Sequence, residues 1–261
     1  MTLNRLKLKG MISAIVTIIF AIALTSCQSV QALTVTESDG IYETRSLHSP
    51  DGIGKFYMGR EIAKVMGHEA AAWLERDDRA TSENPRTAIA SLGLQPADVV
   101  ADIGAGTGYF TFRISPLVPD GKVLAADVQP EMLELMQFVI DREQITNVEP
   151  ILSAPDDPHL PESAVDLALM VDAYHEFKYP REMMEKITES LKPGGRVALV
   201  EYRRENPFIL IKGLHKMTEK QAVKEMEAVG LQWVETLETL PQQHLMIFQK
   251  PGDRNTRTML K

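Results

Sequence analysis

Three glycines at alternate positions, Gly104, Gly106 and Gly108, directly follow the apolar run Val99–Ile103. Glycine has no Cβ, so it adopts positive φ at little cost and lets a ligand approach the backbone closely. In open α/β sheets, ligands bind where such a turn joins the end of a strand to the next helix. We therefore expect residues 104–108 to line a binding site.

A carboxylate, Asp127, ends the next strand-like run, Lys122–Asp127, 19 residues after Gly108. A carboxylate at this place can accept hydrogen bonds from both hydroxyls of a ribose. Each feature alone has an ordinary explanation, the glycines as a plain turn and Asp127 as a cap for the helix that begins near Pro130. Together they predict an adenosine-type ligand.

The glycine spacing separates two kinds of adenosine ligand. The dinucleotide fingerprint is G-x-G-x-x-G, and here Tyr109 occupies the position of its last glycine. The chain instead has G-x-G-x-G, with Asp102 two residues before the first glycine. This spacing argues against a nicotinamide-dependent oxidoreductase, an alternative that binding of NADH would revive.

The arrangement resembles motif I of the class I S-adenosylmethionine-dependent methyltransferases. The resemblance continues through Asp127, through residues 160–167, which are similar to the lead into strand four, and through residues 191–196, which are similar to the turn into strand five. It covers residues 98–250. It implies a Rossmann-like α/β fold, with a seven-stranded, mostly parallel sheet, helices on both faces and an antiparallel last strand. It also implies S-adenosyl-L-methionine as the cofactor.

The resemblance assigns roles on the cofactor side. The glycines would line the methionine and ribose portion, Asp102 would lie near the amino end, and Val128 would pack on the adenine. Asp156 or Asp157 would bond the adenine amine, although turn chemistry beside the neighbouring prolines explains either aspartate equally well. The implied cofactor-binding residues are Asp102, Gly104, Ala105, Gly106, Thr107, Gly108, Asp127, Val128, Asp156 and Asp157.

Tyr174, His175 and Glu176 follow the strand-like run Val165–Val171, on the rim where this family holds its methyl acceptors. His175 could take a proton from the acceptor, Glu176 could orient His175, and Tyr174 could wall the pocket. The alternative is that His175 and Glu176 only brace the following helix. Residues 201–204 are a second candidate wall, and residues 215–216 are expected to be an exposed basic pair.

The composition excludes several classes of partner. Among 261 residues, 28 Lys and Arg against 36 Asp and Glu give a net charge of −8, without the basic stripe that binds nucleic acid. Aromatic residues make up 6%, with no stacking platform for single strands. The six histidines are scattered with no i, i+4 pair, and Cys27 is the only cysteine, so we expect no metal site. A small-molecule methyl acceptor is therefore favoured over RNA or protein.

The elements that must position these residues alternate between apolar strands and amphipathic helices. This alternation predicts a parallel α/β sheet covered on both faces. Two C-terminal strands without a helix between them predict an antiparallel member at one edge. Strands are expected at 99–103, 122–127, 148–152, 165–171, 196–201, 231–236 and 244–249, and helices at 60–76, from 84, at 109–117, 130–142 and 180–191, and from a capping box at 218–221 to 230.

The N-terminus has the pattern of a targeting segment. Arg5, Lys7 and Lys9 precede the apolar run Met11–Leu24, as in a secretory signal. The run ends in Leu24-Thr25-Ser26-Cys27, which resembles the lipobox of bacterial lipoproteins and implies lipidation of Cys27 and attachment to a membrane.

Two alternatives to lipidation stay open. Cleavage after Ala32 would release a secreted or periplasmic protein, and an uncleaved segment reaching Leu33 would be a membrane anchor. The expected organisation is a signal segment (1–27), a linker (28–55), an N-terminal helical cap that covers the site or simply docks on the domain (56–95), the methyltransferase-like domain (96–250) and a tail (251–261).

Two functions from different classes fit this sequence. The first is a methyltransferase that moves a methyl group from S-adenosylmethionine to a small molecule by in-line displacement, which depends mainly on alignment of donor and acceptor. The alternative is an exported, non-catalytic module that keeps the fold and binds an adenosine ligand. The intact glycine turn, Asp102 and Asp127 favour the enzyme.

Overall fold

The computed structural model describes residues 37–252. The predicted signal segment with Cys27 and most of the predicted tail lie outside the described residues. The chain divides into two compact units, one up to Glu61 and one from Ile62 onward, and each is described by itself. Within residues 37–252, no helix is long and apolar enough to cross a membrane.

The first unit contains most of a four-stranded sheet in the order β1-β2-β3-β4. The segment predicted as a linker therefore carries strands, and that prediction was wrong. Its turn residues join neighbouring strands: the Asp39 carboxylate accepts the N–H groups of Ile41 and Tyr42 between β1 and β2. The strands are β1 (Glu37–Ser38), β2 (Tyr42–Thr44), β3 (Gly52–Tyr57) and β4 (Arg60–Ala63).

The long helix predicted over residues 60–76 is also wrong. All four residues of β4 are buried, so its apolar positions follow strand burial rather than one helical face. Gly67 then has extended backbone (φ −67°, ψ 156°), and from Gly67 to Ser91 the helices are short. These are η1 (His68–Ala70), α2 (Ala71–Leu74), α3 (Arg79–Ser82) and α4 (Pro85–Ser91), the last beginning after the predicted cap Asn84.

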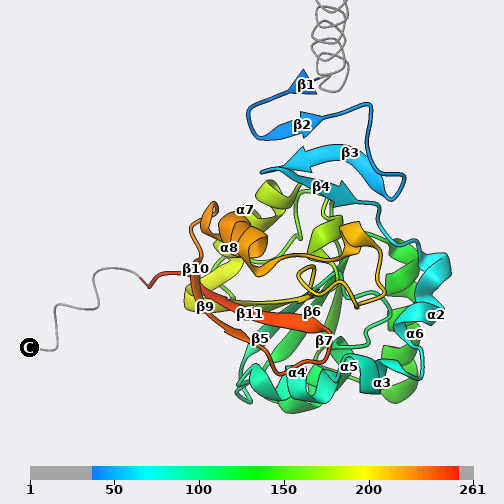
Figure 1. Ribbon diagram of the computed structural model, residues 1–261. Coiled ribbons are helices and arrows are strands. Elements are labelled where there is room, and N and C mark those ends of the chain that lie inside the picture. The colour runs from blue at the N-terminus through cyan, green and yellow to red at the C-terminus, as the bar shows by residue number, and fades with distance from the viewer. Residues whose placement is uncertain (1–36, 253–261) are drawn as a thin grey trace, which may run out of the picture. The chain divides into compact units, whose positions relative to one another are not determined.

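The second unit is built on a seven-stranded sheet in the order β10-β11-β9-β8-β5-β6-β7 (Figure 1). The five strands from β9 to β7 in this order are parallel, whereas β11 runs antiparallel to both β9 and β10. The predicted fold class is confirmed. The strands are β5 (Val99–Ile103), β6 (Lys122–Asp127), β7 (Val148–Leu152), β8 (Val165–Val171), β9 (Leu191–Tyr202), β10 (Gln232–Leu237) and β11 (Gln243–Gln249).

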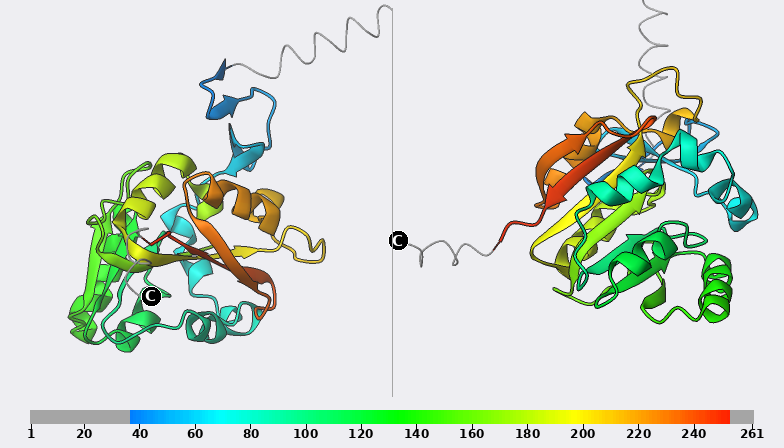
Figure 2. Two further views of the ribbon diagram at one scale, coloured as in Figure 1. Left: turned by 90° about the vertical axis from the view of Figure 1, so that its left-hand side faces the viewer. Right: turned by 90° about the horizontal axis from the view of Figure 1, so that it is seen from below.

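Apolar residues of the sheet are buried beneath helices on both faces (Figure 2). On one face, Met184 and Ile187 of α7 and Met226 of α8 pack in one core cluster with sheet residues such as Leu199. On the other face, α4, α5 and α6 contribute to two further clusters. The remaining helices are α5 (Thr111–Ile114), η2 (Ser115–Leu117), α6 (Pro130–Glu143), η3 (Tyr174–Glu176), α7 (Pro180–Ser190), η4 (Gly213–His215) and α8 (Glu219–Glu227).

Thr218 caps α8 as predicted, because its side chain accepts the Gln221 N–H. The order of the strands places the carboxyl ends of β5, β6 and β8 beside one another. The glycine turn, Asp127 and the residues after Val171 follow these three strands, so the fold brings the two halves of the predicted site to one edge of the sheet.

Candidate active site

The glycine turn is tightly enclosed. Gly104 and Gly106 have positive φ (72° and 56°), a backbone conformation that side chains other than hydrogen disfavour. A Cβ on Gly104 would lie 2.6 Å from the Cβ of Ala173, and a Cβ on Gly106 would lie 2.7 Å from a methyl group of Leu74. The turn is therefore held between the β8 rim and the end of α2, and at Gly104 the Ala173 Cβ leaves no room for a larger residue.

Asp127 is fixed by backbone donors on both carboxylate oxygens. Its Oδ2 accepts the Gly106 N–H (2.8 Å) and its Oδ1 accepts the Gln129 N–H (2.9 Å). Burial raises the pKa of Asp127, and these two hydrogen bonds oppose the rise. Each carboxylate oxygen can accept a second hydrogen bond. The side chain is thus oriented to receive two hydroxyl donors, which is the chemistry of a ribose.

The surroundings of Asp127 fit the remainder of an adenosine. Val128 is the next residue and keeps 39% of its surface exposed. Ser153 donates its N–H to the Asp127 carbonyl (2.9 Å), while its Oγ is buried without a hydrogen-bond partner among the described residues. An apolar surface and an unpaired polar group therefore flank the carboxylate. Sequence reasoning missed Ser153, although it stands directly after strand β7.

The two aspartates that follow take different places. The Asp157 carboxylate accepts the His159 N–H (2.7 Å), and its backbone pairs with Ala154, so it closes the turn as the turn interpretation expects. Asp156 is exposed. The adenine role of either residue stays a prediction.

Asp102 is buried and accepts the Thr111 hydroxyl (2.6 Å) at the start of α5. Burial raises the pKa of Asp102 to about 6, with the nearby Asp127 adding to the rise and the Thr111 hydrogen bond opposing it. The carboxylate thus ties strand β5 to the helix that follows the turn. Its predicted place near the amino end of the methionine portion stays a prediction.

Two residues at the end of α2, Leu74 and Glu75, bring the N-terminal cap into contact with the glycine turn. Besides the Leu74 contact, Thr107 Oγ1 lies 2.5 Å from Glu75 Oε1 and donates to it. Ala105, between the glycines, is buried and donates its N–H to the Ala126 carbonyl. The residues at the end of α2, rather than one long helix, cover the turn.

His175 is buried and oriented by Glu201, the last but one residue of β9. His175 Nδ1 lies 2.6 Å from Glu201 Oε2, and its backbone N–H donates to Oε1 (3.3 Å). The prediction that Glu176 orients His175 was therefore wrong. Burial alone would lower the pKa of His175, but Glu201 more than offsets this effect and the pKa is raised.

Two further side chains meet His175 on its other nitrogen. His175 Nε2 lies 3.1 Å from His215 Nδ1 and 3.8 Å from Glu176 Oε1, and His215 Nδ1 lies 3.3 Å from the same Glu176 oxygen. We call His175, Glu176 and His215 the histidine cluster. His215 was expected to belong to an exposed basic pair, yet only 21% of its side chain is exposed. Lys216 is buried, and its Nζ donates to the Ile209 carbonyl.

Tyr174 does not wall a pocket, contrary to the prediction. Its side chain is fully buried, and its hydroxyl donates to Glu225 of α8 (2.7 Å). The ring also packs edge-on against Phe177. Tyr174 therefore anchors the turn that carries His175 and Glu176 to the core.

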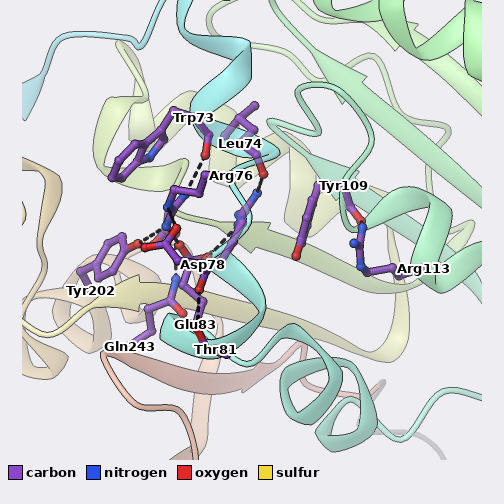
Figure 3. Close-up of polar contacts among 12 residues, drawn as sticks. Trp73, Leu74, Arg76, Asp78, Thr81, Glu83, Tyr109, Arg113, Tyr202 and Gln243 are labelled. Atoms are coloured by element: carbon purple, nitrogen blue, oxygen red, sulfur yellow. Dashed lines mark hydrogen bonds and ion pairs between the residues drawn. The ribbon is translucent and has the colours of Figure 1, made fainter.

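A buried ion network joins the cap to the end of β9 (Figure 3). Arg76 and the Tyr202 hydroxyl both donate to Glu83 Oε1, and Arg79 donates to Glu83 Oε2 (2.8 Å). Asp172, at the end of β8, accepts an amide N–H of Gln243 (2.7 Å), and burial raises its pKa well above the usual range. Tyr202, one of the residues proposed as a second wall, is thus fixed by the cap.

One backbone segment connects the two halves of the site. The Met66 N–H donates to Glu176 Oε2 (3.1 Å), and the Met66 carbonyl accepts the side-chain amide of Gln129 (3.0 Å). Gln129 in turn donates its backbone N–H to Asp127. The histidine cluster and the ribose-type carboxylate are therefore neighbours in one hydrogen-bonded structure.

The comparisons with known proteins agree with this arrangement. Residues 101–197 match the model of a protein family described as "Methyltransferase domain". An uncharacterised methyltransferase-like protein of Schizosaccharomyces pombe is 30% identical over 142 residues, which are 54% of this chain and 53% of the relative. The ubiquinone/menaquinone biosynthesis C-methyltransferase of Ectopseudomonas mendocina is 26% identical over 48% of this chain and 50% of its own. The chain spans about half the length of the curated relatives it matches.

Solved structures share the fold over a larger part of the chain. A SAM-dependent methyltransferase from Aquifex aeolicus superimposes with a TM-score of 0.67 at 22% identity, covering 71% of this chain and all of that one. Phosphoethanolamine N-methyltransferase 2 of Haemonchus contortus, solved with S-adenosyl-L-methionine, gives 0.57 at 14% identity, covering 71% of this chain and 57% of that one. The central domain has the class I methyltransferase fold.

Proposed function

We propose that this protein is an S-adenosylmethionine-dependent methyltransferase that acts on a small molecule. The observation that carries the proposal is the Asp127 carboxylate, held by the N–H groups of Gly106 and Gln129 beside a glycine turn whose first glycine, Gly104, has no room for a Cβ. Val128 and Ser153 would take the adenine, and the glycine turn the methionine portion. The match of residues 101–197 to a methyltransferase domain supports this function.

The reaction asks little of the protein beyond alignment. The acceptor's nucleophilic atom gives an electron pair to the methyl carbon, and the carbon–sulfur bond breaks with its electron pair left on sulfur. S-adenosylhomocysteine is released. A proton leaves only if the acceptor atom carries one. In that case it would be released near the histidine cluster.

The first experiment is thermal unfolding of the purified full-length protein with S-adenosylhomocysteine, using NADH as the control ligand. A ligand at 100 times its Kd stabilises the native state by about 2.7 kcal/mol. We expect a rise in Tm with S-adenosylhomocysteine alone. A rise with NADH alone would favour an oxidoreductase, and no rise with either ligand would remove the donor-site proposal.

Turnover separates the enzyme from a non-catalytic binding module. One relative is named as a ubiquinone/menaquinone C-methyltransferase and one structural neighbour as a phosphoethanolamine N-methyltransferase, so a panel should include hydroxylated aromatic and amine acceptors. We expect an acceptor-dependent release of S-adenosylhomocysteine. Ligand binding without turnover on any acceptor would favour the module.

We also propose that the chain is exported and lipidated at Cys27, from the basic and apolar pattern of residues 1–27. The C27S protein should leave the membrane fraction and lose the mobility shift of a lipidated chain. If it fractionates and migrates like the wild type, lipidation at Cys27 is excluded, and cleavage after Ala32 or an uncleaved anchor replaces it.

A further inference from the structure

The histidine cluster brings together three ligand atoms of the kinds that bind transition metals. Its members come from η3 and η4, 40 residues apart in the chain. The two imidazole planes are inclined at 77°, with ring centroids 5.0 Å apart and with His175 Nε2 facing His215 Nδ1. The arrangement brings two ring nitrogens and one carboxylate oxygen within 4.8 Å of one another.

We propose that His175 Nε2, His215 Nδ1 and a Glu176 carboxylate oxygen bind a divalent metal ion, with zinc as the ion that fits best. Zinc bonds to imidazole nitrogen and carboxylate oxygen are about 2.0–2.2 Å long, so tetrahedral geometry places neighbouring ligand atoms about 3.3–3.6 Å apart. The three observed separations are 3.1, 3.3 and 3.8 Å. They outline one face of such a tetrahedron.

The groups behind the ligands support the same conclusion. A metal-bound histidine usually donates a hydrogen bond from its second ring N–H to a carboxylate. In this protein Glu201 Oε2 lies 2.6 Å from His175 Nδ1. The second oxygen of Glu176 accepts the Met66 N–H, which leaves Oε1 directed at the histidines. Two of the three ligands are therefore oriented before any ion arrives.

A second cluster contains a histidine whose two ring nitrogens both face carboxylates. His244 lies between two carboxylates, with Nδ1 3.0 Å from Glu238 and Nε2 3.0 Å from Glu205. Each ring nitrogen there has its own acidic partner. In the histidine cluster two ring nitrogens instead face each other at 3.1 Å, a position in which they share either one hydrogen or one cation. Among the described residues, Glu219, Glu238 and His244 form the second group whose ligand atoms lie close enough to hold a metal ion. This group contains one histidine rather than two, so His244 is the matched comparison.

Three protein ligands leave a fourth tetrahedral position open, as in catalytic zinc sites. The side chains of Glu176 and His215 keep 15% and 21% of their surface exposed. Hydrogen bonds through Met66 and Gln129 connect Glu176 to Asp127. If the proposed methyl transfer holds, the ion would bind an acceptor hydroxyl or thiol and lower its pKa, so that the proton leaves to solvent before the atom attacks the methyl carbon. His175 then acts as a ligand rather than as a base.

Metal binding is tested on the full-length protein, stripped with a chelator and then titrated with cobalt(II) or zinc. We expect one equivalent to bind, the cobalt form to show the intense visible bands of four-coordinate cobalt, and zinc to abolish them. The H215A protein should lose these bands, and E201Q should bind 10- to 100-fold more weakly because His175 loses the carboxylate charge that raises its basicity as a ligand. The H159A and H244A proteins should bind like the wild type.

Several results would overturn the proposal: no stoichiometric binding, a six-coordinate cobalt spectrum, or H215A binding as tightly as the wild type. Loss of binding in H244A with retention in H215A would transfer the site to the other cluster. Far-UV circular dichroism confirms that each variant is folded. These readouts do not depend on methyl transfer, so binding without turnover would remove only the proposed function.

Discussion

The glycine turn and the histidine cluster are neighbours, but they are built in different ways. The turn and Asp127 fall within 26 consecutive residues, from Asp102 to Asp127, and their geometry is set by backbone N–H groups and by the absence of side chains. The cluster depends on side chains from η3 and η4, with supporting groups from β9 and from Met66. A site built from backbone tolerates the loss of one side chain better than a site built from paired buried charges.

The largest expected effect of a substitution is therefore in the cluster. H175A leaves the Glu201 carboxylate fully buried without its imidazole, and breaking a buried ion pair costs about 3–5 kcal/mol of unfolding free energy. Urea unfolding in the presence of a chelator measures this loss without any contribution from bound metal. The matched change is H244A, whose carboxylate partners are half exposed and can be solvated. Equal losses in the two variants would contradict the comparison.

A substitution at Asp127, beside the glycine turn, should weaken ligand binding rather than prevent folding. D127A removes both acceptors for the ribose hydroxyls, which should weaken S-adenosylhomocysteine binding by about 3 kcal/mol, or about a hundredfold in Kd, while the protein still folds. Isothermal titration calorimetry gives the affinity and circular dichroism the fold. D120A is the control, because Asp120 is exposed, precedes β6 and has no predicted role in the site. An unchanged affinity in D127A would remove the ribose assignment.

The pH dependence of stability gives a third contrast. The pKa of Asp102 is about 6 in the folded protein and about 3.9 in an unfolded chain. Its contribution to stability is therefore fully present below about pH 4 and is lost as the pH rises through about 6. The uncharged D102N side chain escapes this loss and can still accept the Thr111 hydroxyl.

Relative to the wild type, D102N should therefore gain about 2–3 kcal/mol of unfolding free energy between about pH 4 and pH 8. Denaturant unfolding at both pH values, without ligand, measures the difference. A gain that is the same at both pH values would mean that Asp102 is ionised at low pH as well, against the raised pKa.

The glycine turn and the histidine cluster also differ in how much of each could be predicted from the sequence. Strands β5 to β8 were predicted within their observed bounds, because buried parallel strands form continuous apolar runs. The turn and Asp127 were predicted because their spacing is local. The partnership of His175 with Glu201 and His215 was missed, since it joins residues 26 and 40 positions apart that only the completed sheet brings together.

The errors at the N-terminal side have a related cause. The segment 60–76 has apolar residues at helical spacing, but strand pairing of β4 with β3 determines the structure of its first residues and Gly67 interrupts the remainder. In the segment predicted as a linker, polar turn residues were read without the strands that they connect. Short strands leave a weak periodic signal, because so few residues alternate.

The smallest expected effect is the difference in unfolding free energy between two glycine-to-alanine variants. It separates the strain of positive φ from the steric contact of an added methyl group. G104A places a methyl group 2.6 Å from the Ala173 Cβ at a φ of 72°, whereas G230A has a φ of 83° and nothing within 4 Å of the added Cβ. Both variants carry the strain of a side chain at positive φ, about 1 kcal/mol, and only G104A adds overpacking, about 1–3 kcal/mol. Urea unfolding should therefore show a difference of about 2 kcal/mol between them. If the two losses are equal, Ala173 moves aside freely, and the rim that carries His175 is not held against the glycine turn.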